Sequence, residues 1–328
     1  MIRHQQSDIH PLFPRPRPFA CFEKFRMLFV IFARGYGQGQ SRILAAIALQ
    51  CGRKGLVGMK NSAYKILKKP FFGRYVKPWR WPEDSDQSQW RRLSIASESG
   101  ASISALLASA YLPQAKGAVL MAHPMGVAAK GFWMKYGHAE LLRQAGYHVM
   151  VFDLNGFGES SSTNMDFPLD VLAAGQALQA QYPDLPVAVV GASMGAAMSV
   201  CAMAQPDHPF KAAVLEAAFP TLLHFWSRYP IPKLSIQVSK LVYPAAERRL
   251  RPIHAAERLV GSPSMLMIYG DADEFTPVKD GQLLWRALKN KTQTEFWQVP
   301  GATHTHAYAA QPEEYAQRVI GFLGTHLA

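Results

Sequence analysis

The feature of this sequence that most constrains its fold is an alternation of short apolar runs with longer segments of helical spacing. The runs occupy residues 118–122, 149–152, 187–190, 212–215, 265–269 and 295–299. Runs that stay apolar, rather than alternating with polar residues, are typical of strands in a parallel sheet covered by helices on both faces. Between them, segments such as 135–145 and 169–181 have the length and spacing of helices. Repeated strand–helix units predict a doubly wound, mostly parallel α/β sheet.

Two departures from this alternation add detail to the predicted architecture. Residues 92–96 and 103–110 have β-like patterns on either side of a turn at 98–101, which predicts an opening antiparallel pair. Between the runs ending near Leu215 and beginning near Met265 lie about 50 residues, too many for a simple crossover. We therefore expect a short helical cap inserted at about residues 219–262.

Charge divides the chain into two parts. The protein has 328 residues, of which 49% are hydrophobic and 18% charged, so it has enough apolar material for a large core. Residues 1–82 hold 16 lysines and arginines against two acidic residues, a net charge of +14, and the total of +12 leaves −2 for residues 83–328. This predicts a basic, partly helical N-terminal extension at 1–82 and a main domain at 83–328.

The basic extension leaves two interpretations open. It either packs on the main domain as helices with a solvated basic face, or makes peripheral contact with an anionic membrane surface. Because the positive charge is confined to this segment, the chain as a whole does not resemble a nucleic-acid-binding protein. No uncharged apolar run approaches the roughly 20 residues that span a bilayer, and no signal-peptide pattern begins the sequence.

The three cysteines, Cys21, Cys51 and Cys201, are scattered without metal-binding spacing. They suggest neither a disulfide framework nor a thiolate metal site. The odd count favours a reducing compartment. We therefore expect a cytoplasmic protein, with peripheral membrane association as the second option.

The strongest chemical signal is the string Gly191-Ala192-Ser193-Met194-Gly195. It follows the apolar run PVAVV directly and precedes the helix-compatible sequence AAMSVCAMA. A serine on a sharp strand-to-helix turn has a strained backbone, and small residues two positions away let neighbouring chain pass close to it. Such a nucleophile elbow exposes the hydroxyl at the carboxyl edge of the sheet and at a helix N-terminus. This arrangement predicts Ser193 as a nucleophile.

A serine hydroxyl needs a base to take its proton and an acid to orient that base. The strand-like run MLMIYG is followed by Asp271 and Asp273, and FWQVPG is followed by His304 and His306. Each pair stands where a loop at the carboxyl edge of the sheet begins. The order serine, acid, histidine is therefore available, with Glu216 after the preceding strand as a further candidate acid.

These motifs, taken in order over residues 90–328, resemble the serine hydrolases of the α/β-hydrolase fold. In that family the strings YGDADEFTPV and PGATH correspond to the acid and histidine loops, so the resemblance implies Asp273 and His304 in a catalytic triad with Ser193. Asp271 and His306 remain the alternatives.

A further motif, MAHPMG at residues 121–126, resembles the oxyanion-hole segment of the family. The resemblance implies that the backbone N–H groups of Met125 and Met194 form the oxyanion hole. Pro124 stands where glycine is usual, which alters the loop but leaves the amide of Met125 in place. We interpret His123 as a structural residue.

The string DLNGFGESS, residues 153–161, resembles the turn that follows the next strand in the family. Asp153 is expected to make a turn hydrogen bond, and Gly156 and Gly158 to allow the backbone geometry of the turn.

Within this fold the chain is most similar to the serine-aminopeptidase-like and Bem46-like group, on the evidence of its short cap and the lead-in RPIHAAERL. The resemblance implies a hydrolase that cleaves a carboxylic ester through an acyl-enzyme, a reaction for which we expect no metal and no organic cofactor. The apolar cap residues Leu222, Phe225 and Trp226 would line a pocket for a hydrophobic acyl or alcohol part, so the expected partner is a small-molecule or lipid ester. Thioesterase, peptidase and acyltransferase activity remain open, as does a non-catalytic binding protein that keeps the fold.

Overall fold

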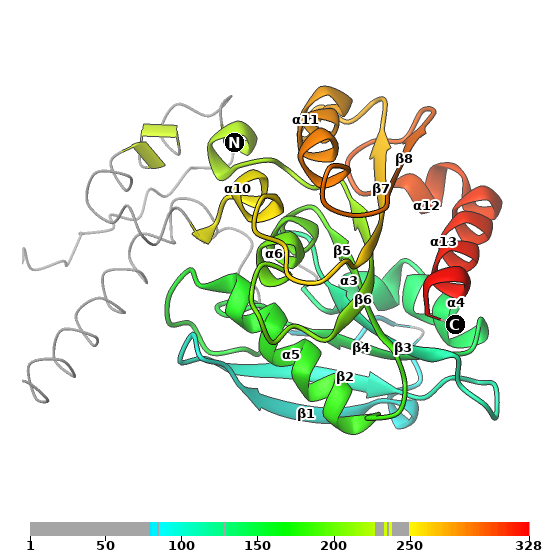
Figure 1. Cartoon of the computed structure of the whole chain (residues 1–328). Coiled ribbons are helices and arrows are strands. Elements are labelled where there is room, and N and C mark those ends of the chain that lie inside the picture. Colours follow the sequence, from blue (N-terminus) through cyan, green and yellow to red (C-terminus); the bar gives the residue numbers. More distant parts are fainter. Residues whose placement is uncertain are drawn as a thin grey trace, which may run out of the picture. The chain divides into compact units, whose positions relative to one another are not determined.

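The computed structural model describes residues 79–327, except for residues 84, 127–128, 227–232, 235 and 238–248 (Figure 1). The expectations for residues 1–78 and for part of the cap insertion lie outside the described residues. Among the described residues, no helix is both long enough and apolar enough to cross a membrane.

The described residues form a sheet of eight strands in the order β1-β2-β4-β3-β5-β6-β7-β8. The strands are β1 (Arg91–Ala96), β2 (Ser102–Ala108), β3 (Gly117–Ala122), β4 (Tyr147–Phe152), β5 (Val187–Ala192), β6 (Phe210–Glu216), β7 (Ser264–Gly270) and β8 (Thr294–Val299). β1 and β2 pair antiparallel, as do β2 and β4, and every other neighbouring pair is parallel. The predicted mostly parallel sheet with an antiparallel opening pair is confirmed.

Helices connect the strands and cover both faces of the sheet. The helical segments of the described residues are η2 (Gln87–Gln89), α3 (Gly131–Lys135), α4 (His138–Gln144), α5 (Phe167–Gln181), α6 (Met194–Ala202), α7 (Leu222–Phe225), α10 (Pro252–Ala256), α11 (Val278–Leu288), α12 (Ala307–Ala310) and α13 (Pro312–His326). The helix expected over residues 135–145 is confirmed as α4, which begins at His138, and the preceding helix α3 ends at Lys135. Gly137 between them has φ of 78°, a left-handed conformation that ends one helix before the next begins.

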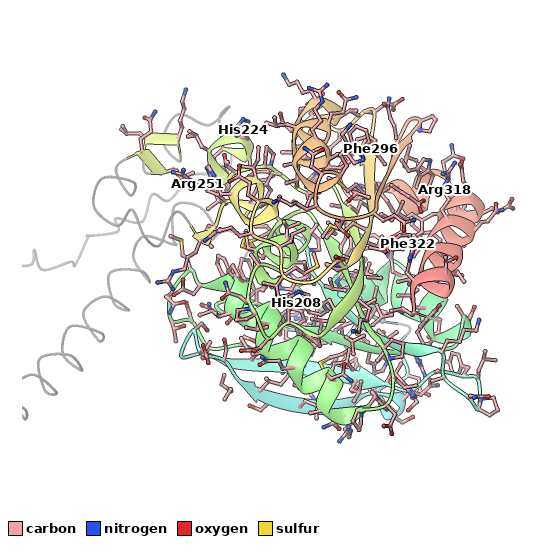
Figure 2. All side chains as sticks on the ribbon, viewed as in Figure 1. His208, His224, Arg251, Phe296, Arg318 and Phe322 are labelled. Carbon is pink, nitrogen blue, oxygen red and sulfur yellow. The ribbon has the colours of Figure 1, made fainter. Side chains whose placement is uncertain are left out.

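Two apolar cores lie on opposite faces of the sheet, because successive residues of a buried strand point to opposite sides. On β3, Leu120 faces the core under α5, α6, α10 and α11, whereas Met121 faces the core under α3, α4, α12 and α13. Figure 2 shows the side chains on these layers: on α13, Phe322 is buried against the sheet while Arg318 lies at the surface. Burial on both faces explains why the strands appear in the sequence as continuous apolar runs.

The first described residues already belong to this packing. The Trp79 ring lies 4.2 Å from the Lys130 ammonium group, and a Cβ added to Gly131 would approach the same ring to 2.8 Å. Trp81 packs beside Trp79 with ring centroids 5.7 Å apart. The tryptophans just before the composition change near residue 82 therefore contact the main domain.

Candidate active site

Ser193 occupies a sharp turn between β5 and α6. Its φ of 49° and ψ of −110° are unusual for a residue other than glycine, so the turn is strained as the sequence motif predicts. Its main-chain N–H donates to the carbonyl of Glu216, at the end of the neighbouring strand β6, over 2.8 Å. The tight turn is thereby fixed to the sheet, and only 1% of Ser193 is exposed.

The two glycines of the motif lie where neighbouring backbone passes close by. A Cβ added to Gly191 would come within 2.6 Å of the Ala196 backbone, and one added to Gly195 would collide with the Ala122 carbonyl at the end of β3. Side chains at these positions would push α6 away from the sheet. The predicted requirement for small residues is confirmed.

The loops after β7 and β8 bring Asp273 and His304 to the same place. His304 Nε2 lies 2.9 Å from Ser193 Oγ, and His304 Nδ1 lies 2.8 Å from Asp273 Oδ2. Since an ionised carboxylate only accepts, Nδ1 carries the proton that it donates to Asp273, and Nε2 is free to accept from the serine hydroxyl. Three residues separated by up to 111 positions in the sequence thus form one continuous chain of hydrogen bonds.

The Asp273 carboxylate is held in its charged form by several donors. Burial acts to raise its pKa, but the hydrogen bond and charge of His304 and the bonds from Thr276 outweigh burial, and the pKa is lowered. Thr276 Oγ1 donates to Oδ2 over 2.6 Å, while the N–H groups of Phe275 and Thr276 donate to Oδ1 over 2.8 and 2.9 Å. Asp273 is therefore poised to carry negative charge beside His304.

The alternative acid and histidine lie elsewhere. The exposed Asp271 carboxylate accepts from the N–H of Gly301 over 2.7 Å, which fixes the turn after β8. The His306 ring folds back on its own loop, where Nδ1 lies 2.7 Å from the His304 carbonyl. Among the described residues neither group bonds to Ser193, so the structure brings together Asp273 and His304 rather than these two.

Glu216 lies beside this arrangement but does not join it. Its Oε1 accepts the N–H of Ala307 over 3.0 Å, and Oε2 is buried with no hydrogen-bond partner among the described residues. Burial raises its pKa to about 7, although the bond from Ala307 and the charge of His304 act in the opposite direction. Glu216 therefore contacts both catalytic loops, through its carbonyl to Ser193 and its carboxyl to Ala307.

A small apolar pocket opens directly above the serine. Its lining residues are Met125, Ser193, Met194, Phe219, Leu222, Phe225 and Trp226. The structure thus brings the expected oxyanion-hole and cap residues together around Ser193, and adds Phe219. The free volume is about 10 Å³, room for about one water molecule, because the aromatic side chains fill the space.

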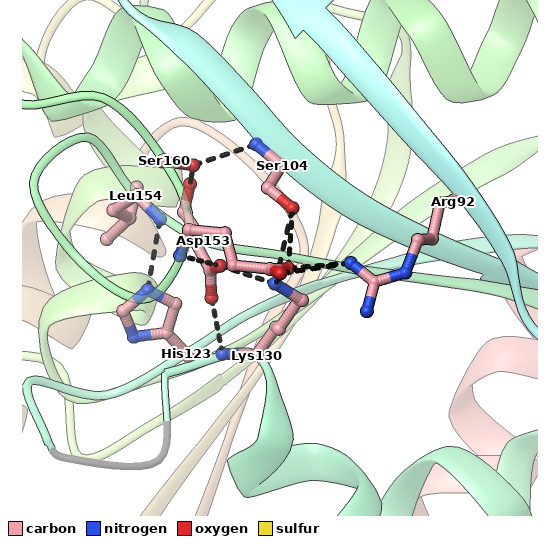
Figure 3. A network of polar contacts seen from close by, with 8 residues as sticks. Arg92, Ser104, His123, Lys130, Asp153, Leu154 and Ser160 are labelled. Atoms are coloured by element: carbon pink, nitrogen blue, oxygen red, sulfur yellow. Dashed lines mark hydrogen bonds and ion pairs between the residues drawn. The ribbon is translucent and has the colours of Figure 1, made fainter. Parts of the chain in front are cut away.

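The loop that carries Met125 is fixed by His123. This ring is completely buried, and burial lowers its pKa, so it is neutral. Nδ1 donates to the Pro124 carbonyl over 2.7 Å. Nε2 accepts the N–H of Leu154 over 3.0 Å, as Figure 3 shows. His123 therefore ties the loop after β3 to the loop after β4, in the structural role expected for it.

Figure 3 also shows a buried ion pair beneath the same loops. The Lys130 ammonium group lies 2.6 Å from Asp153 Oδ2 and 2.8 Å from Glu159 Oε2. Asp153 also accepts the main-chain N–H groups of Lys130 and Glu159, both over 2.9 Å. The expected turn role of Asp153 is confirmed. A Cβ at Gly158 would collide with its carboxylate.

Sequence reasoning missed three contributions to the site: the Thr276 hydroxyl, the Phe219 ring and the Lys130 partner of Asp153. Thr276 had a signal, because a threonine three residues after an aspartate often closes a local hydrogen-bonded turn. Phe219 follows β6 closely and could have been grouped with the cap aromatics. Lys130 had none, because nothing in its local sequence marks it as buried.

Comparison with known proteins gives a consistent assignment. A family model described as serine aminopeptidase, S33, matches residues 113–256. Among curated relatives, human ABHD12B is 24% identical over 169 residues, and the match covers 46% of this chain but only 44% of that protein. The human putative protein-lysine deacylase ABHD14B is 26% identical over 215 residues, covering 64% of this chain and 84% of the relative.

Solved structures share the fold at low sequence identity. The Pyrococcus furiosus esterase Pf2001 superimposes with a TM-score of 0.62 at 20% identity, over 78% of this chain and 98% of the esterase. The Pyrococcus horikoshii acylaminoacyl peptidase does so with a TM-score of 0.55 at 17% identity, over 73% of this chain and 41% of the peptidase. The α/β-hydrolase architecture expected from the motifs is confirmed.

Proposed function

Because this chain belongs to the serine hydrolases of the α/β-hydrolase family, we propose that it cleaves carboxylic esters with a hydrophobic acyl or alcohol part, using Ser193, His304 and Asp273. One observation carries the proposal. The Ser193 hydroxyl, His304 ring and Asp273 carboxylate are joined by hydrogen bonds of 2.9 and 2.8 Å, and Ser193 lines an apolar pocket.

In the proposed reaction, Ser193 Oγ attacks the ester carbonyl carbon while His304 Nε2 takes the hydroxyl proton. The tetrahedral intermediate collapses as the C–O bond to the alcohol breaks, and Nε2 returns the proton to the departing oxygen. Water then attacks the acyl-enzyme with His304 again as base, which releases the acid and restores Ser193. Asp273 accepts the hydrogen bond from the Nδ1–H group throughout and stabilises the imidazolium.

The oxyanion of each intermediate is assigned to the N–H groups of Met125 and Met194. Met194 is the first residue of α6, so its N–H points out of the helix end, where the helix dipole favours negative charge. Met125 and Met194 line the same pocket as Ser193. One well-placed donor of this kind contributes about 3–4 kcal/mol to the stabilisation of a transition state.

The pocket supports an apolar substrate. Leu222, Phe225 and Trp226 line it, and none of the lining residues that the structure describes is charged. Since its free volume is only about 10 Å³, the aromatic side chains must move to admit an acyl chain. We therefore expect short acyl chains to be preferred and longer chains to be accepted only after this movement.

The test is hydrolysis of p-nitrophenyl esters of increasing acyl length by the protein and by Ser193→Ala. We expect the variant to lose activity by about 10⁴-fold or more, because the nucleophile is removed. A fluorophosphonate should label Ser193 in the intact protein, and Ser199→Ala, which removes another buried serine hydroxyl on α6, is the matched control that keeps activity. Equal activity in both variants would contradict the proposal.

Amide and thioester substrates are the alternatives, because the same triad cleaves them and relatives include a peptidase and a putative deacylase. Parallel assays with a p-nitroanilide and a thioester of the same acyl group distinguish these activities. A kcat/KM for the anilide equal to or above that for the ester would replace the ester assignment with an amidase or peptidase. If the protein cleaves none of the ester, the anilide and the thioester, and Ser193 is not labelled, the remaining interpretation is a non-catalytic binding protein.

We also propose that residues 1–82 make peripheral contact with anionic membranes, on the strength of their net charge of +14. The full chain should co-sediment with vesicles containing phosphatidylserine at low salt and dissociate as salt rises. A chain beginning at Trp79, which retains the tryptophan contacts with the main domain, is the matched comparison. Equal sedimentation of the two chains would contradict the proposal.

A further inference from the structure

A second, larger pocket lies on the outer side of the histidine loop. It is lined by Tyr136, His138, Thr305, His306, Tyr308, Ala309 and Pro312, and its volume is about 190 Å³. These residues come from the start of α4, the segment before it, the histidine loop and the segment around α12. None of them lines the pocket above Ser193, so the two pockets are separate.

The side chain that distinguishes this pocket is His138. Only 4% of it is exposed, and neither ring nitrogen has a hydrogen-bond partner among the described residues. Aromatic rings surround it: Phe132 stacks at 5.7 Å between centroids, and Tyr308 lies at 4.9 Å. Both ring nitrogens are shielded, so a ligand reaches them only when the side chains around His138 move. Because a buried polar group without a partner costs about 1–3 kcal/mol, a ligand that makes this contact gains affinity.

The electrostatics favour a neutral ligand. Burial, together with the charge of His306, lowers the pKa of His138 to about 3, so the ring is neutral and offers one N–H donor and one acceptor nitrogen. Among the described residues, neither an acidic side chain nor a lysine or arginine lines the pocket. A charged ligand would therefore lose its hydration without meeting a counter-charge.

The walls favour an aromatic ring. Tyr136 and Tyr308 line the pocket, and aromatic rings pack well against one another in offset or edge-to-face arrangements. In size, a cavity of about 150 Å³ is enough for benzene, so a volume of about 190 Å³ accepts one ring with a small substituent.

We propose that this pocket binds a small, neutral, phenol-like molecule, with its ring against Tyr136 and Tyr308 and its hydroxyl hydrogen-bonded to His138. A hydroxyl suits His138 because it can donate to the unprotonated ring nitrogen or accept from the protonated one. This proposal does not rest on the proposed ester hydrolysis.

The position of the pocket suggests an influence on the active site. Thr305 and His306 line it and directly follow His304, and Thr305 has a strained φ of 58°. An occupant therefore touches the loop that positions His304 against Ser193. We expect occupancy to change the rate of Ser193 labelling by a fluorophosphonate.

The direct test is binding of 4-methylphenol, toluene and tetramethylammonium to the full chain, measured by ligand-observed NMR titration. Toluene has a similar shape without the hydroxyl, and tetramethylammonium tests a cation among aromatic rings. We expect 4-methylphenol to bind most tightly, and His138→Phe to weaken it by about tenfold while changing toluene less than about twofold. Ser193→Ala, at the floor of the other pocket, is the matched control and should bind 4-methylphenol as the intact protein does.

Two further measurements keep the test decisive if His138→Phe fails to fold. The ring ¹⁵N signals of His138 should shift on addition of 4-methylphenol, and Tyr136→Ala, which removes a partly exposed wall, should weaken 4-methylphenol and toluene alike. Equal affinity for 4-methylphenol and toluene, tighter binding of tetramethylammonium, or His138 signals that do not move would each overturn the proposal. Loss of binding in Ser193→Ala would assign the ligand to the other pocket, with the same consequence.

Discussion

The ends of two neighbouring strands, β6 and β7, each carry a buried carboxyl group close to the same histidine loop, yet their environments differ sharply. Asp273, after β7, accepts four hydrogen bonds from Thr276, Phe275 and His304, and its pKa is lowered. Glu216, at the end of β6, accepts one from Ala307, and burial raises its pKa to about 7. Burial acts in the same direction on both, so the number of donors decides which group is charged.

This difference assigns different roles to the two groups. Asp273 can hold negative charge against an imidazolium at neutral pH, as a triad acid must. Glu216 is close to half protonated at neutral pH and bonds only to main-chain N–H of the histidine loop. It is therefore a positioning residue, because it acts on the loop rather than on the reacting atoms.

The largest effect is expected from Asp273→Asn. The amide keeps the shape of the side chain but can donate to His304 Nδ1, which favours the tautomer that cannot accept from Ser193. We expect kcat/KM for a p-nitrophenyl ester to fall by about 10³–10⁴-fold while the fold is kept. A fall of less than tenfold, with the protein folded by circular dichroism, would remove Asp273 from the triad and return Glu216 to consideration.

The next largest effect concerns stability and pH, through Glu216→Gln. A carboxyl whose pKa rises from 4.5 to about 7 on folding stabilises the folded state below pH 4.5, and this contribution disappears as pH rises through 7. The shift corresponds to about 3 kcal/mol. The variant keeps an acceptor for the N–H of Ala307 but cannot ionise, so its stability does not fall in this way as pH rises.

The measurement is urea denaturation of both proteins between pH 4.5 and 8.5. We expect the free energy of unfolding of the variant, relative to the original protein, to rise across this range. If the free energies of unfolding of the two proteins change with pH in parallel, Glu216 does not ionise with the raised pKa. The difference drawn between Glu216 and Asp273 would then be wrong.

Whether a feature of this site can be predicted from the sequence depends on how far apart in the chain the interacting residues lie. Ser193 and the pairs Asp271/Asp273 and His304/His306 each follow an apolar strand, so strand periodicity places them at the carboxyl edge, and the family resemblance selects Asp273 and His304 from the two pairs. The mostly parallel arrangement of the sheet follows from the same pattern, since apolar runs mark strands buried on both faces.

Interactions that depend on the packing of distant segments could not be predicted. Lys130 pairs with Asp153 only because the loops after β3 and β4 meet beneath the site, and its own sequence resembles an ordinary surface lysine. The two contacts of Glu216 likewise involve Ser193 and Ala307, which lie far apart in the sequence. Local patterns fix the element a residue belongs to, but not the partner it meets in the interior.

A smaller effect is expected from Thr276→Val, which removes the hydroxyl donor to Asp273 Oδ2 and keeps the side-chain shape. A hydrogen bond to a charged group contributes about 1.5–3 kcal/mol, and its loss moves the pKa of Asp273 upward. We therefore expect kcat/KM to fall about tenfold at pH 7, because Asp273 is held less firmly against His304. An unchanged kcat/KM would show that the main-chain donors alone hold Asp273 in place.

The smallest effect is expected from Asp271→Asn, two residues from the proposed acid. The exposed Asp271 accepts only the N–H of Gly301 among the described residues, and an asparagine oxygen can accept the same bond. We expect kcat/KM to change by less than about threefold, because no charge beside His304 is lost. Both variants replace an aspartate by its amide in one loop, so comparison with Asp273→Asn isolates the contact with His304 from a general loss of negative charge. Comparable losses of kcat/KM in the two variants would mean that the negative charge of the loop as a whole supports His304, rather than the hydrogen bond of 2.8 Å between Asp273 and His304.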